Sequence, residues 1–113
     1  MADASKKLAA NGWADGHKLW VTEIGVASDD GRALTDNYGW PTAMTYTQAG
    51  AALTKAVGEL KTLPTLGGII VYASQDRQLP GATNQREDYF GIVRKDNAAK
   101  GAYTSAVKAL AAG

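Results

Sequence analysis

The alternation of two short apolar runs with helical patterns is the feature that most constrains the fold. Residues 18–24 (KLWVTEI) are rich in β-branched and aromatic side chains, and residues 67–74 (GGIIVYAS) form a second, more apolar run. Near-continuous apolar runs of this length are typical of strands that are covered on both faces, as in a parallel sheet. Because a helical pattern separates the two runs, the sequence predicts two parallel strands joined by a right-handed crossover.

Helical segments flank both runs. Residues 3–11 favour a short helix that ends at Asn11-Gly12. Thr45 and Gln48 have the spacing of a capping box. An apolar stripe follows them to about residue 61, formed by Ala49, Leu53, Ala56, Val57 and Leu60. A last helix is expected after residue 101. The order helix, strand, loop, helix, strand, loop, helix predicts an α/β fold class.

Composition sets the outer limits. A chain of 113 residues is enough for one small domain. A net charge of +1 gives no electrostatic footprint for nucleic acid or an anionic membrane. The absence of cysteine excludes disulfides and thiolate metal sites. No apolar run reaches the ~20 residues of a membrane span, and the N-terminus lacks a secretory core. We therefore expect a soluble chain with no cofactor and no metal. These features do not indicate a cellular compartment.

Long polar segments follow both strands, over residues 25–44 and from residue 75 to about residue 86. In α/β folds, ligands bind at the carboxyl ends of the strands, where such segments begin. Two strands alone would leave two apolar edges open to other chains. We therefore expect this chain to be incomplete on its own.

Several segments resemble one enzyme class. WVTEIG (20–25) resembles the strand that carries the nucleophile in (β/α)8-barrel glycoside hydrolases of the retaining clan that includes cellulases and β-xylosidases. IIVYASQD (69–76) looks like the eighth strand of these barrels, and residues 86–103 are similar to their closing segment, with Asn97 and Gly101 replacing a glycine and a proline. The resemblance implies a partial (β/α)8 barrel, with a helix followed by two parallel βα units. Residues 1–113 would be a single C-terminal quarter of it.

The resemblance implies that Glu23 is the nucleophile of a retaining β-glycosidase. Such enzymes need a second carboxyl group ~5–5.5 Å away, which the family supplies from an Asn-Glu pair, and no such dipeptide occurs here. A complementing chain would have to supply it, and the chain alone would be inactive. The alternative is a non-catalytic structural or carbohydrate-binding subunit of a larger assembly, such as a virion or cell-surface complex, completed by homo-oligomer contacts. A split gene with the rest of the barrel on a separate chain is a third possibility.

Carbohydrate contacts are predicted at both strand exits. Trp40 is a candidate stacking platform, or a loop anchor. Four residues at the second exit are candidates for sugar contacts or for loop caps: Tyr72, Ser74, Gln75 and Asp76. Trp20 is expected to pack beneath a helix. The structural alternative for Glu23 is a carboxylate at a strand end that faces solvent or pairs with a lysine.

Charged residues outside the two strand exits are expected to have structural and not catalytic roles. The spacing of Asp29, Asp30 and Asp36 does not fit a calcium loop and favours a solvated turn. Residues 86–88 (RED) are expected to form a surface charge cluster or to brace the last loop. His17 is the sole histidine, which excludes a multi-histidine metal site.

Overall fold

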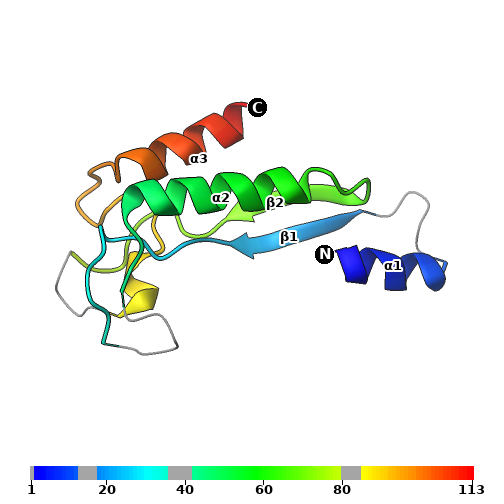
Figure 1. Ribbon diagram of the computed structural model, residues 1–113, viewed down its shortest axis with the longest axis horizontal. Coiled ribbons are helices and arrows are strands. Elements are labelled where there is room, and N and C mark those ends of the chain that lie inside the picture. The colour runs from blue at the N-terminus through cyan, green and yellow to red at the C-terminus, as the bar shows by residue number, and fades with distance from the viewer. Residues whose placement is uncertain (1, 13–17, 36–41, 80–84) are drawn as a thin grey trace.

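The computed structural model describes residues 2–12, 18–35, 42–79 and 85–113. Their helices and strands follow the predicted order: α1 (Ala2–Ala10), β1 (Leu19–Ile24), α2 (Tyr46–Leu60), β2 (Leu66–Val71), the one-turn 3-10 helix η1 (Arg86–Tyr89) and α3 (Ala102–Ala112). The fold is a small α/β arrangement of two parallel strands and helices (Figure 1). The second strand is shorter than predicted, because regular pairing stops at Val71.

Helix α2 begins at the predicted capping box. The Thr45 hydroxyl accepts a hydrogen bond from the Gln48 amide at 3.1 Å, and the Gln48 side chain accepts one from the Thr45 amide at 3.2 Å. Two amide groups that the first helical turn cannot pair are thereby satisfied. The end of α1 is also as predicted, since Gly12 follows the helix with a φ of 82°, a conformation that favours glycine.

The two strands pair in parallel, with Leu19 opposite Leu66 and Ile24 opposite Val71. The pairing is irregular between Val21 and Ile24. Helix α2 connects the strands and lies beside α3, and the loops that leave both strands gather beyond their carboxyl ends (Figure 1).

The core lies between the sheet and helices α2 and α3. Its buried residues are Ala49, Leu53, Val57 and Tyr103, and the partly buried side chains around them include Ile24, Val26, Ile69, Val71, Val107 and Leu110. Gly50 lets the helices approach closely, because a Cβ there would lie 2.9 Å from the Ala102 carbonyl oxygen. The predicted apolar stripe of α2 therefore faces the core.

Only one face of the sheet is covered within the described part of the chain, whereas the sequence predicted cover on both. On the other face, Trp20 is 60% exposed and Ile70 is 51% exposed. The prediction that Trp20 packs beneath a helix is wrong. Its indole instead lies against Gly67 and Gly68 of the neighbouring strand, where the missing side chains leave room for it.

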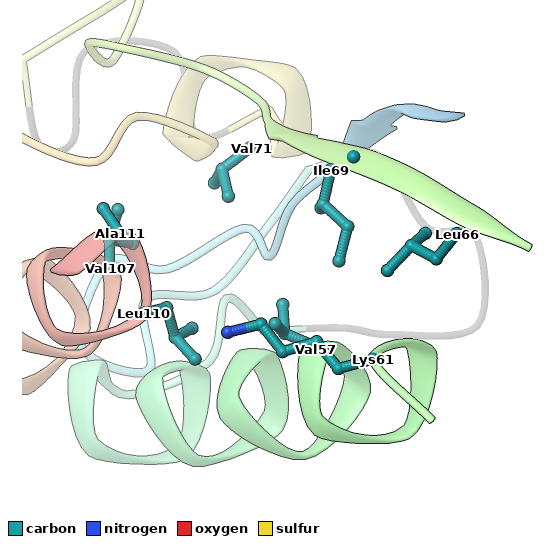
Figure 2. Close-up of a pocket in the computed structure, with 9 residues that line it drawn as sticks. Val57, Lys61, Leu66, Ile69, Val71, Val107, Leu110 and Ala111 are labelled. Carbon is teal, nitrogen blue, oxygen red and sulfur yellow. The ribbon is translucent and has the colours of Figure 1, made fainter. Parts of the chain in front are cut away.

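A cavity of about 250 Å³ interrupts the packing between β2 and the two helices (Figure 2). Its lining is apolar except for Lys61, and includes Val57, Leu66, Ile69, Val107 and Leu110. Among the described residues, no helix has the length and apolar character needed to cross a membrane.

Candidate functional site

Glu23 lies at the carboxyl end of β1, on the uncovered side of the chain. Ile24 and Val26 pack against the core, and side chains alternate along extended backbone. Glu23, Gly25 and Ala27 therefore face away from the helices. The Glu23 side chain is exposed and has no hydrogen bond or ion pair within the described part of the chain. The strand tolerates this carboxylate because it is not buried.

Gly25, two residues after Glu23, is a glycine for a steric reason. A Cβ at Gly25 would overlap the carbonyl oxygen of Tyr72 and would lie 3.1 Å from Cδ1 of Phe90. The backbone of the second strand exit therefore passes directly against the first. The rings of Tyr72 and Phe90 lie 5.8 Å apart at an angle of 49°, so Tyr72 is packed at the same edge as Glu23.

The other predicted sugar-contacting residues lie in different settings. Ser74 is exposed at the second strand exit. The Gln75 side chain donates to the Lys95 carbonyl and to Oδ1 of Asn97, both at 2.8 Å. Its amide thus holds the turn before α3. Trp40 lies outside the described residues, as do His17 and Asp36.

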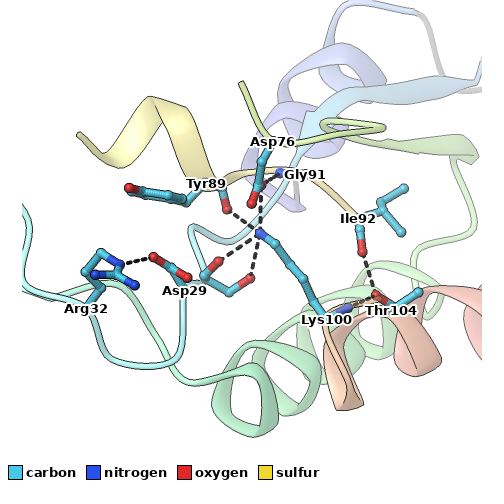
Figure 3. A network of polar contacts seen from close by, with 9 residues as sticks. Asp29, Arg32, Asp76, Tyr89, Gly91, Ile92, Lys100 and Thr104 are labelled. Atoms are coloured by element: carbon cyan, nitrogen blue, oxygen red, sulfur yellow. Dashed lines mark hydrogen bonds and ion pairs between the residues drawn. The ribbon is translucent and has the colours of Figure 1, made fainter. Parts of the chain in front are cut away.

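A buried ammonium group ties the two strand exits together. Lys100 is 0% exposed, and its Nζ donates to Oδ1 of Asp76 at 2.7 Å, to the Ser28 carbonyl at 2.8 Å and to the Tyr89 carbonyl at 3.0 Å (Figure 3). Ser28 follows β1 and Asp76 follows β2, so one side chain joins both loops. Oδ1 of Asp76 also accepts from the Gly91 amide at 2.8 Å. The Asp76 carboxylate is buried among these partners. Its contact with a sugar stays a prediction.

Burial acts on both members of this ion pair. Desolvation raises the pKa of Asp76, while the hydrogen bond and charge of Lys100 act in the opposite direction. Desolvation likewise lowers the pKa of Lys100 against the pull of Asp76. No motif in the sequence marks Lys100 as a site residue. The available signal was a lone lysine between alanine and glycine just before a helix, inside the segment that resembles the closing part of the barrel.

Two interpretations of acidic residues need correction. Asp29 is not in a solvated turn: it is 5% exposed and pairs with the Arg32 side chain three residues later. The turn bends so that Asp30, with a φ of 51°, takes the solvent side. Asp88 is also 5% exposed, so the surface-cluster alternative is wrong for it, whereas the alternative that it braces the last loop stays a prediction. The 3-10 turn of η1 carries it inward, and it has polar interactions inside the chain.

A second cavity, the edge cavity, opens where β1 ends. It measures about 240 Å³ and is lined by Gly25, Val26, Ala27, Thr42, Met44, Arg86 and Phe90. Three consecutive residues of the strand exit, Gly25, Val26 and Ala27, which begin two positions after Glu23, thus line this cavity. In the described part of the chain, no three His, Cys, Asp or Glu side chains are grouped so that they could hold a metal ion.

Comparison with known proteins gives a likeness of fold. The chain is similar in structure to part of the β-glucuronidase of Faecalibacterium prausnitzii, with a TM-score of 0.59 and 15% sequence identity over 98% of this chain and 18% of that chain. The chain therefore has the fold of a segment of a larger glycoside hydrolase and spans under a fifth of its length. The sequence matches no protein-family model and no curated protein.

Proposed function

We propose that this chain is the nucleophile-bearing part of a retaining β-glycosidase, and that protein outside these 113 residues completes the (β/α)8 barrel. The observation that carries the proposal is the place of Glu23, an exposed carboxylate at the carboxyl end of a parallel strand that has no partner among the described residues. Ligands of α/β folds bind at this edge. The fold likeness to a segment of a glycoside hydrolase supports the same conclusion.

In the proposed reaction, a Glu23 carboxylate oxygen attacks the anomeric carbon of a glycoside. The bond to the leaving oxygen breaks, and a second carboxyl group supplied in trans gives that oxygen its proton. Water then hydrolyses the glycosyl-enzyme ester with the second group acting as base. Tyr72, Ser74 and Trp40 would contact the sugar, while Lys100 holds the loops that surround it.

Removal of the nucleophile tests this role. The native species, with whatever partners it co-purifies with, should hydrolyse an aryl β-glycoside, and Glu23→Gln should abolish turnover without changing the circular dichroism spectrum. Glu59→Gln is the matched control, because Glu59 is exposed in the last turn of α2, which leads to the start of β2 and not to the carboxyl ends of the strands.

A chemical rescue makes the test specific. With Glu23→Ala, an activated dinitrophenyl β-glycoside and added azide should give the α-glycosyl azide, because azide attacks the face from which the carboxylate is missing. Unchanged turnover in Glu23→Gln would refute the proposal.

The exposed face around Trp20 and Ile70 favours a second candidate. A structural or carbohydrate-binding subunit would use this apolar face to join copies of itself or other subunits. Such a subunit would assemble normally with Glu23→Gln and would show no hydrolysis before or after the substitution.

A further inference from the structure

The cavity between β2, α2 and α3, which we call the helix cavity, lies on the helix side of the sheet and not on the side of Glu23. Val57 in its wall belongs to the core and is 3% exposed, whereas Lys61 and Ala111 in its wall are exposed. The helix cavity therefore runs from the core to the surface beside the ends of the two helices (Figure 2).

The size of the helix cavity suits a short aliphatic chain. Its volume is about 250 Å³, and an apolar cavity of about 150 Å³ is already large enough to bind benzene. At about 30 Å³ per molecule of liquid water, the space corresponds to about eight groups of that size. A methylene group is of similar size, so a chain of about eight carbons would fill the cavity.

The wall of the helix cavity offers apolar contact on two sides. Leu66 and Ile69 come from β2, and Val107 and Leu110 come from α3. These four side chains are only partly buried. A hydrocarbon chain in the cavity would remove their apolar surface from water, which is favourable in proportion to the area covered.

Lys61 places a cation at the mouth of the helix cavity. Figure 2 shows its side chain among the lining residues, with the nitrogen directed toward Leu110. Among the described residues no carboxylate pairs with this ammonium, and Glu59, two positions earlier, pairs instead with Lys55 at 3.9 Å. The apolar mouth therefore has one charged donor that a ligand can meet.

The ends of the helices restrict where an anionic group can lie. Helix α2 ends at Leu60 and α3 ends at Ala112, and the last carbonyl groups of a helix carry partial negative charge. An anion near these carbonyls would be repelled unless it also contacts a cation, which Lys61 provides. A ligand with an apolar chain and a single carboxylate, placed at Lys61, satisfies both conditions.

We propose that the helix cavity binds a medium-chain fatty acid, with its alkyl chain between β2 and the two helices and its carboxylate on Lys61. The Lys61 ammonium donates to a carboxylate oxygen, and the apolar wall covers the chain. This site is independent of the proposed glycosidase reaction, because Glu23 lies on the other side of the sheet and does not line the cavity.

A binding titration on the full chain, followed by NMR, tests this inference. Sodium octanoate is the main probe. Octanamide has the same chain and head-group shape without the charge, and sodium acetate has the charge without the chain. Octanoate should bind about threefold to fivefold more tightly than octanamide at low ionic strength, as expected for one exposed ion pair. Acetate should not bind, and octanoate should shift the amide signals of Leu66, Val107 and Leu110.

Substitutions separate the charge from the chain. Lys61→Gln should lower the octanoate affinity to that of octanamide, and Lys61→Arg should keep the preference. Lys108→Gln is the matched control, because Lys108 is exposed on α3 and does not line the helix cavity. Val107→Phe, which fills the cavity without a change of charge, should lower the octanoate affinity about tenfold because the chain loses its buried surface.

Three results would overturn the proposal. They are equal affinity of the wild type for octanoate and octanamide, acetate binding as tight as that of octanoate, and the absence of octanoate binding. An unchanged octanoate affinity in Val107→Phe would overturn it as well, since the chain would then lie elsewhere. Glu23→Gln should bind octanoate like the wild type, so the outcome for the proposed reaction is read separately.

Discussion

Lys100 is the residue on which the geometry of the site most depends. Its ammonium joins Ser28, Asp76 and Tyr89, which belong to three separate segments. Removing one member of a buried ion pair leaves an uncompensated charge in a dry environment, whereas replacing both members by apolar groups is far less costly. The Lys100–Asp76 ion pair therefore holds the two strand exits together, and replacing one of its members alone should destabilise the fold.

Lys100→Met should accordingly lower the free energy of unfolding by about 3–5 kcal/mol. The double variant Lys100→Met, Asp76→Leu should recover much of that loss. Urea unfolding of the wild type, both single variants and the double variant would measure the coupling between the two residues. Additive losses in the double variant would contradict a buried, coupled pair.

Tyr103 makes folding sensitive to alkaline pH. Its ring is 0% exposed, and burial raises its pKa above the ordinary value of 10.0, with the Val26 backbone opposing in part. Above about pH 10 the unfolded tyrosine loses its proton while the folded one keeps it. The folded state then binds more protons, so stability falls as pH rises through this window. Tyr103→Phe should show a weaker fall between pH 9.5 and 11 in thermal melts, and an identical pH slope would refute this.

At the scale of elements, the capping box explains where α2 begins. Thr45→Ala should lower the free energy of unfolding by about 1 kcal/mol, because the Gln48 amide loses its acceptor. Thr47→Ala is the matched control, since Thr47 is exposed within the first turn of the helix. Because alanine has a higher helix propensity than threonine, Thr47→Ala should not lower the free energy of unfolding, and a loss of similar size in both variants would contradict the role of the cap.

The elements show why sequence reasoning succeeded in some places and failed in others. The capping box and apolar stripe of α2 are local patterns, so the helix was predictable from the residues themselves. Trp20 was misplaced because a strand that is apolar on both faces has no two-residue period to indicate which side faces the helices. Lys100 was missed because its contact with Ser28 joins residues 72 positions apart. No linear spacing encodes such a contact.

At the scale of the whole molecule, one face of the sheet is left uncovered by the residues that the structure describes. Trp20 and Ile70 expose large apolar side chains on the uncovered face of the two-stranded sheet, and a partner chain or a second copy that covers this face would bury both. Ile70→Lys should therefore lower the mass of the native species measured by light scattering, because a charged side chain there opposes burial. Leu79→Lys is the matched control, as Leu79 is also 51% exposed but lies outside the sheet. It should leave the mass unchanged. If Ile70→Lys assembles like the wild type, the face is a free surface and the barrel is not completed across it.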